Sequence, residues 1–126
     1  MKIGVLKEEK VPVDKRVPLT PKQCRVLLNT YPALEIAVKS SGIRCFHDEM
    51  YIAEGIQVVN DLTDCDVMIG VKEVPKSSLI PNKTYFFFSH TIKEQPYNKE
   101  LLLKMMELNI SMVDYEVLKN QKGKRL

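Results

Sequence analysis

The sequence has few of the residues from which metal sites and nucleotide-binding loops are built. Its two histidines and three cysteines, none in a CxxC spacing, do not form a set of metal ligands. Neither GxGxxG nor GxxxxGK[ST] occurs, so we find no nucleotide-binding fingerprint in this chain. The apolar run near the N-terminus, residues 3–6, is too short for a signal peptide or a membrane span. We therefore expect a cytoplasmic protein with no metal and no membrane partner.

The cysteines are odd in number, and their neighbours are apolar or helix-forming. Cys24, Cys45 and Cys65 lie far apart along the chain. This pattern predicts reduced thiols in the core of a cytosolic protein and no disulfide bond.

Size and charge narrow the class of protein further. With 126 residues and 44% hydrophobic residues, the chain is long enough for one compact domain. Nineteen Lys and Arg against sixteen Asp and Glu give a net charge of only +3, which does not indicate nucleic-acid binding. A charged hairpin turn near residues 120–123, between two short strands, accounts for the basic tail of Lys119, Lys122, Lys124 and Arg125.

Apolar runs alternate with helical patterns along the chain. Strands are predicted at residues 3–6, 34–38, 57–59, 66–71, 84–89 and 110–113, and helices at about 21–29, 48–53 and 97–108. The runs DVMIGV and TYFFFS show no alternation, as in parallel strands covered on both faces. The order predicts a doubly wound α/β domain of the flavodoxin or Rossmann-like type, with three layers and a mainly parallel sheet.

Helix ends and helix faces can also be predicted from the sequence. Thr20 followed three residues later by Gln23 has the spacing of a capping box, and His47 or Asp48 is expected to cap the second helix, which ends at Gly55. Inward-facing positions are predicted at Gln23, Cys24, Val26 and Leu27 in the first helix and at Leu101, Leu102, Met105 and Met106 in the last.

Ionisable residues follow four of the predicted strands. They are Lys7 and Glu8, with Arg16 in the loop behind them, Lys72 and Glu73, His90, and Asp114 and Glu116. Any one of them could be a solvated loop residue, but the carboxyl ends of parallel strands meet at one edge, where ligands bind in such sheets. Their convergence favours a binding or catalytic site.

The residue types suit one chemistry. An arginine grips a carboxylate with its planar fork, while a lysine in a cleft and a histidine can transfer protons near neutral pH. Two other interpretations stay open: Arg16 could simply pair with Asp14, and His90 could be a partly buried histidine bonded to backbone. Glu73 could tune Lys72 or bind a substrate amine, although neighbouring strand residues point in opposite directions.

Several motifs resemble a known family. LKEEKVPVDKRVPLTP, GVKEVP, FFFSHTIKEQPYN and VDYEVLKNQKGKRL occur in this order in the sequence. They resemble the N-terminal domain of the alanine dehydrogenase and saccharopine dehydrogenase superfamily, whose fold is like the formate/glycerate dehydrogenase catalytic domain. FSHTIK with the following glutamine, and HDEMYIAEG, are similar to the lysine-forming saccharopine dehydrogenases and to lysine-ketoglutarate reductase domains.

The resemblance implies that residues 1–126 form an N-terminal substrate domain. A separate C-terminal Rossmann domain in the same protein, not included in this chain, would bind NAD or NADP, with the active site between the two. The resemblance further implies that Lys72 and His90 are the acid–base groups, that Arg16 holds a substrate carboxylate, and that Glu73 and Glu116 tune the site. Asp14 stands where the saccharopine enzymes have a glutamate, and by this resemblance it is expected, with Glu73 and Glu116, among the substrate-binding residues. The end at Leu126, just as an apolar segment begins, suggests a domain of a longer protein.

Three functions are consistent with these observations. The first is an NAD(P)-dependent oxidoreductase that interconverts saccharopine with lysine and 2-oxoglutarate. The second is an alanine dehydrogenase acting on pyruvate and alanine. The third is a binding module that holds a small amino or oxo acid without chemistry, because the hydride carrier has no site in this chain.

Overall fold

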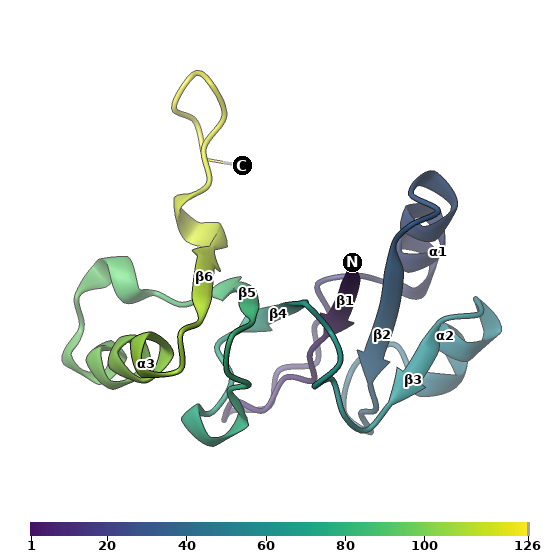
Figure 1. Cartoon of the computed structure of the whole chain (residues 1–126), viewed down its shortest axis with the longest axis horizontal. Coiled ribbons are helices and arrows are strands. Elements are labelled where there is room, and N and C mark those ends of the chain that lie inside the picture. Colours follow the sequence, from purple (N-terminus) through teal and green to yellow (C-terminus); the bar gives the residue numbers. More distant parts are fainter. Residues whose placement is uncertain (126) are drawn as a thin grey trace.

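The computed structural model describes residues 1–125, which form a six-stranded parallel sheet with helices on both faces (Figure 1). The strands are β1 (Lys2–Val5), β2 (Glu35–Lys39), β3 (Gln57–Val59), β4 (Val67–Lys72), β5 (Thr84–Phe88) and β6 (Ser111–Asp114). The helices are α1 (Pro21–Thr30), α2 (Asp48–Ala53) and α3 (Pro96–Glu107), with short 3-10 turns η1 (Lys76–Ser78), η2 (Thr91–Lys93) and η3 (Tyr115–Val117). The predicted α/β architecture is confirmed.

The strand order is β3-β2-β1-β4-β5-β6, and every neighbouring pair is parallel. The chain builds outward from β1 to β3, returns to the centre at β4, and then builds outward in the other direction. The change of direction lies between β1 and β4, where Ile3 pairs with Val67 and Val5 with Ile69. In sheets of this kind, the crevice outside the carboxyl ends of the two central strands is the usual ligand site.

Helix α1 begins as the sequence predicts, but its inner face is rotated from the expected one. Thr20 caps the helix, with Gln23 N donating to Thr20 Oγ1 at 3.3 Å and Thr20 N donating to Gln23 Oε1 at 2.9 Å. Cys24 is buried and Leu27 is half-buried, whereas Gln23 is exposed and Val26 is 62% exposed. The inward prediction was wrong for these last two, because Gln23 serves the cap and position 26 faces away from the sheet.

Helix α2 is preceded by a polar cluster. His47 occupies the N-cap position, but its side chain makes no capping hydrogen bond to any residue in 1–125, so that prediction was wrong. The carboxylate of Asp48 instead accepts from Ser40 Oγ at 2.6 Å, from Ser41 N at 3.2 Å and from Arg44. Gly55 follows the helix with a φ of +69°, as expected of a helix-ending glycine.

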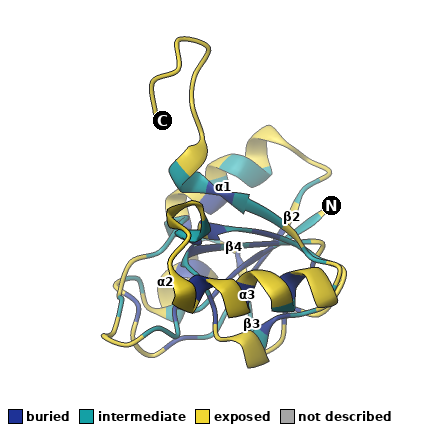
Figure 2. Cartoon of the chain, turned by 90° about the vertical axis from the view of Figure 1, so that its left-hand side faces the viewer, coloured by how far each residue is buried: buried dark blue, intermediate teal, exposed yellow. Residues whose placement is uncertain are grey.

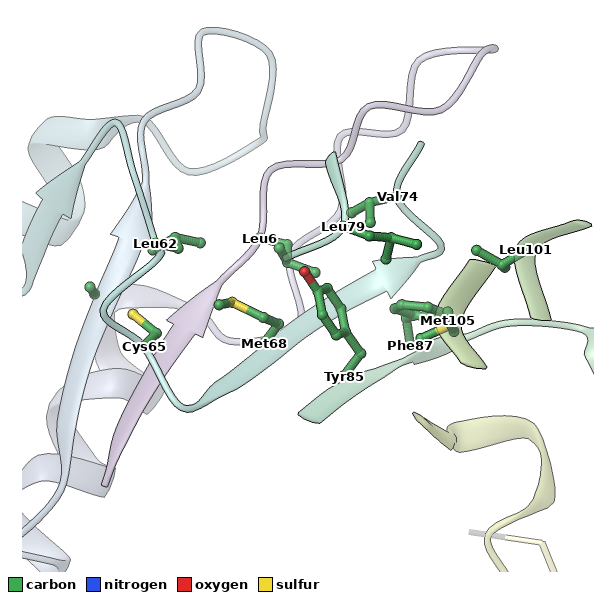
Figure 3. Packing of buried hydrophobic residues seen from close by; sticks show 11 residues of the cluster. Leu6, Leu62, Cys65, Met68, Val74, Leu79, Tyr85, Phe87, Leu101 and Met105 are labelled. Carbon is green, nitrogen blue, oxygen red and sulfur yellow. The ribbon is translucent and has the colours of Figure 1, made fainter. Parts of the chain in front are cut away.

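Two hydrophobic clusters lie on opposite faces of the sheet. On one face, Leu6, Met68, Tyr85 and Phe87 pack with other buried residues, and Leu101 and Met105 of α3 lie beside Phe87 (Figure 3). On the other face, α1 and α2 cover β1 and β2, and the residues involved are Val5, Cys24, Ile36, Val38, Tyr51 and Ile56. The result is the three-layer arrangement that the alternating pattern predicts.

The inner face of α3 is only partly as predicted. Leu101 and Met105 are buried at 6% and 1% exposure, whereas Leu102 and Met106 are 41% and 68% exposed. Figure 2 shows the corresponding exposed outer surface of this helix. The adjacent leucines and methionines share a helical turn, but the sheet contacts one member of each pair.

Strand β5 alternates in burial, contrary to the expectation that both its faces are covered. Tyr85 and Phe87 are fully buried, Phe86 is half-buried and Phe88 is 36% exposed. The rings of Phe86 and Phe88 lie 6.3 and 5.2 Å from the ring of Tyr115, measured between centroids. The aromatic run therefore divides between the core and a more open face.

The three cysteines of the described chain are free thiols, as predicted. Cys24 and Cys65 are buried, and burial raises the pKa of each thiol to about 11. Cys45 is exposed, so its predicted place in the core was wrong. It follows Arg44, whose guanidinium is drawn into the Asp48 cluster, and the thiol lies on the outside of that loop.

The basic tail forms a turn that projects from the body of the domain (Figures 1 and 2). Lys119 and Arg125 form one antiparallel bridge in place of the two predicted strands. The side chain of Asn120 accepts from the backbone of Lys122 and of Lys124, each at 3.0 Å, which fixes the turn. Leu126, at the apolar segment expected to begin there, lies outside the described residues.

Candidate functional site

The carboxyl ends of β1, β4, β5 and β6 lie side by side at one edge of the sheet, because these strands are consecutive neighbours and parallel. Lys72 is the last residue of β4, and its Cα pairs with that of Phe88 on β5. His90 therefore lies two residues beyond the partner of Lys72 on the next strand. The structure brings the two sequence-predicted proton-transfer residues to neighbouring strand ends.

His90 forms one network with Glu116 and Lys93. His90 Nδ1 lies 2.9 Å from Glu116 Oε2, and Lys93 Nζ lies 3.0 Å from Glu116 Oε1. Lys93 Nζ is also 3.0 Å from His90 Nδ1. Glu116 comes from the turn after β6, so the pairing joins residues that are 26 positions apart.

The geometry of this network restricts where the protons lie. Nδ1 of His90 either carries a proton and donates it to Glu116, or is bare and accepts from Lys93, since one ring nitrogen cannot do both. Hydrogen bonds from His90, the larger effect, and from Lys93 lower the pKa of Glu116, so this carboxylate stays ionised at neutral pH. Lys93 was not among the predicted site residues, although its position three residues after His90 is a readable signal.

A second network contains Lys72, Asp14 and Arg16. Arg16 donates to the Asp14 carboxylate through Nε at 3.0 Å and Nη2 at 2.6 Å, and Lys72 Nζ lies 4.0 Å from Asp14 Oδ2. The guanidinium of Arg16 lowers the pKa of Asp14 to about 2. The side chain of Arg16 is 62% exposed, so its outer edge faces solvent.

Glu8 binds the backbone at the end of β4. It is 7% exposed, and its carboxylate accepts from the backbone N–H groups of Val71 at 2.7 Å and Lys72 at 3.0 Å. These contacts occur where the pairing of β4 with β5 shifts register between Ile69 and Lys72. Burial raises the pKa of Glu8. Glu8 was expected at a strand end, but its support of β4 has no local sequence signal, because the contact with Lys72 spans 64 residues.

Glu73 does not join Lys72. Its carboxylate pairs with Lys10, and together they line a cavity of about 250 Å³ whose wall also includes Tyr97, Asn98 and Leu101. Glu73 Oε2 is buried and has no hydrogen-bond partner within residues 1–125. Strand β4 ends at Lys72, so Glu73 lies just outside it, and the two residues have different partners: Lys72 lies near Asp14 and Glu73 pairs with Lys10.

Two further absences hold for the described part of the chain. Residues 1–125 contain no group of three or more His, Cys, Asp or Glu side chains placed to hold a metal ion. In the same range, every helix is too short or too polar to cross a membrane.

The structure is a Rossmann-like α/β domain with ionisable residues at the carboxyl edge of its sheet. Residues 4–126 match the family described as alanine dehydrogenase/PNT, N-terminal domain, and the chain belongs to this family.

The relatives are enzymes with longer chains. The chain is 35% identical over 128 residues to α-aminoadipic semialdehyde synthase of Arabidopsis thaliana, covering 98% of this chain and 12% of that protein. It is 29% identical over 126 residues to the NAD(+), L-lysine-forming saccharopine dehydrogenase of Yarrowia lipolytica, covering 96% and 34%. A solved L-alanine dehydrogenase shares the fold, with a TM-score of 0.79 and 24% identity over 98% of this chain and 35% of that one. The chain thus spans about a third or less of these proteins.

Proposed function

We propose that residues 1–126 are the N-terminal substrate domain of a cytoplasmic NAD(P)-dependent oxidoreductase that interconverts saccharopine with lysine and 2-oxoglutarate. The observation that carries this proposal is the placement of the His90–Glu116 pair on the strand end next to that of Lys72, whose Nζ lies 4.0 Å from the Asp14 carboxylate that Arg16 binds. The 35% identity to α-aminoadipic semialdehyde synthase and the FSHTIK motif support the choice of substrate.

Each residue has a role in this reaction. Arg16 binds a substrate carboxylate through its exposed edge, while Asp14 holds the guanidinium in place. Lys72 and His90 move protons to and from the substrate nitrogen and oxygen, which imine formation and its reversal require. Glu116 orients the His90 ring through the 2.9 Å contact between Oε2 and Nδ1.

Glu73 is proposed to bind a substrate ammonium group. Its Oε2 is buried without a partner among residues 1–125, and such an oxygen is costly unless a donor completes it. The adjoining cavity of about 250 Å³ gives a donor room to approach. This observation favours amine binding over the alternative in which Glu73 tunes Lys72.

The nicotinamide cofactor would be held elsewhere in the protein. No glycine-rich phosphate-binding sequence occurs in these 126 residues, so we expect a C-terminal Rossmann domain in the same protein to bind NAD or NADP. The cofactor supplies the hydride acceptor or donor when bound. The residues of this domain would bind the substrate and transfer protons to and from it.

The test uses the complete protein encoded beyond Leu126. We expect oxidation of saccharopine, with NAD(P) reduction followed at 340 nm, and loss of that signal in Lys72→Met, while residues 1–126 alone are inactive. Lys15→Ala, an exposed lysine in the Arg16 loop, is the matched control and should retain parent activity. Oxidation of alanine in place of saccharopine would establish the alanine dehydrogenase alternative. Ligand binding without any oxidation, in a protein that stops at Leu126, would establish the binding module.

A further inference from the structure

Buried polar side chains gather around His90. Residues 1–125 contain six buried polar or charged residues, and three of them, Ser89, Asn98 and Asp114, adjoin His90 or its partner Glu116. Burying a polar group is unfavourable unless its hydrogen bonds are satisfied. Half of the buried polar residues in this range therefore make hydrogen bonds around the His90–Glu116 pair.

Asp114 connects the two strand ends that carry the pair. One carboxylate oxygen, Oδ2, accepts from Ser89 Oγ, and Ser89 directly precedes His90 at the end of β5. The other oxygen, Oδ1, accepts from the backbone N–H of Glu116 at 2.8 Å, at the end of β6. Asp114 is 7% exposed and Ser89 is fully buried. One buried carboxylate thus links the backbones from which the His90 and Glu116 side chains extend.

His90 itself has an unfavourable backbone conformation. Its φ is +57° and its ψ is +12°, in the left-handed region that residues other than glycine avoid. Two contacts hold this conformation: Asn98 Nδ2 donates to His90 O at 2.9 Å, and Thr91 N donates to Ser89 Oγ at 3.1 Å. In this conformation, His90 Nδ1 lies 2.9 Å from Glu116 Oε2.

We propose that Asp114 is a positioning residue that keeps His90 and Glu116 at hydrogen-bond distance by linking the ends of β5 and β6. Its effect is carried by two hydrogen bonds, one at each carboxylate oxygen, and not by its charge. An asparagine of the same shape can accept from Glu116 N and donate to Ser89 Oγ, so it reproduces the link without the charge. The kinetic consequence of this link rests on the proposed acid–base role of His90, but the link itself does not.

The chain suits a direct measurement of the link. It contains only two histidines, so an NMR spectrum of residues 1–126 with labelled imidazole nitrogens shows His90 and His47, and His47 is the internal reference. Glu116→Gln supplies the spectrum of His90 with its partner altered. We expect Asp114→Asn to keep the parent His90 resonances and Asp114→Ala to move them toward those of Glu116→Gln. The His47 resonances should stay unchanged in all variants.

Two further variants separate positioning from loss of folding. Val38→Ala weakens the packing on the opposite face of the sheet, on a strand that contacts neither β5 nor β6, and it should leave the His90 resonances as in the parent. Ser89→Ala removes the hydrogen bond to Asp114 from the β5 side. It should move the His90 resonances as Asp114→Ala does, and it provides the test if Asp114→Ala does not fold. Parent-like His90 resonances in Ser89→Ala or in folded Asp114→Ala would overturn the proposal. Equal displacement in Asp114→Asn and Asp114→Ala would show that the charge matters and would also overturn it.

In the complete enzyme, Asp114→Ala should lower kcat by about 10²-fold, as for a misplaced catalytic group, with KM nearly unchanged, and Asp114→Asn should recover it. If the NMR result holds and kcat does not respond, the link exists and the proposed role of His90 is wrong.

Discussion

Asp14 and Arg16 form a two-bond ion pair, with Nε 3.0 Å and Nη2 2.6 Å from the two carboxylate oxygens. The pair leaves the outer edge of the guanidinium for a ligand, and it brings the carboxylate within 4.0 Å of Lys72 Nζ. The aspartate therefore connects the residue proposed to bind substrate with one proposed to transfer protons.

Replacing Arg16 tests the binding role. In the complete enzyme, Arg16→Ala should weaken substrate binding by about 2 kcal/mol, or roughly 30-fold in KM, because a charge-assisted pair to a carboxylate is lost. Arg16→Lys should not restore it, since lysine lacks the planar fork. Steady-state kinetics measure both, with Lys15→Ala as the control from the same loop. An unchanged KM in Arg16→Ala would show that Arg16 does not bind substrate and only pairs with Asp14.

Acid should remove the contribution of Asp14 to stability. Its pKa is about 2 in the folded protein, below the ordinary 3.8, so the ion pair stabilises the fold above pH 3.8 and is lost as the pH falls through about 2. Because the Arg16 side chain is largely exposed, we expect Asp14→Asn to cost about 1 kcal/mol or less at pH 7. Urea unfolding from pH 7 to pH 2 should show the difference between parent and variant disappearing below pH 3.8. A difference that persists unchanged at pH 2 would contradict the lowered pKa.

Replacing the proposed acid–base residues tests the chemistry. Lys72→Met and His90→Gln should each lower kcat by roughly 10²- to 10⁴-fold in the complete enzyme, as expected for a lost general acid or base. The two residues lie on neighbouring strand ends and serve one substrate, so the double variant should lose less than the product of the single effects. The pH dependence of kcat should also change in each single variant. Fully multiplicative losses with the parent pH profile would show that both residues only position the substrate.

The two methionines at the end of α3 provide a matched pair for stability. Met105→Ala should destabilise the fold by about 2 to 5 kcal/mol, because it leaves a cavity among residues such as Phe87 and Tyr85. Met106→Ala, at a position that is 68% exposed, should change stability by less than about 0.5 kcal/mol. Urea denaturation of the two variants measures this contrast. Equal effects would mean that α3 is rotated from the orientation described.

Thiol labelling tests the burial of the cysteines. Iodoacetamide at pH 8 should alkylate Cys45 in the folded chain, because Cys24 and Cys65 are buried and the pKa of each is about 11. Mass spectrometry of the digested protein identifies the labelled site, and Cys45→Ser should remove the label. Labelling of Cys24 at a comparable rate without denaturant would contradict the packing of α1 on the sheet.

Much of the fold was predictable from local pattern. The six strands and three helices lie within a few residues of their predicted places, because apolar periodicity and end signals such as the Thr20–Gln23 box act over a few residues. The meeting of His90 and Glu116 at one edge also followed, since parallel strands place their carboxyl ends together. The rotation of each helix was less predictable. Val26 and Met106 belong to apolar patterns, but contact with the sheet selects which neighbour is buried.

The sequence by itself therefore determined the order of the elements and the strand ends at which ionisable residues emerge. Tertiary structure decided their partners: Glu8 supports the backbone of Lys72, Glu73 pairs with Lys10, and Asp114 links β5 to β6. The first two of these contacts span more than 60 residues of chain. Local periodicity carries no information on which distant side chains meet, because that depends on the strand order and on the register of β4 against its neighbours.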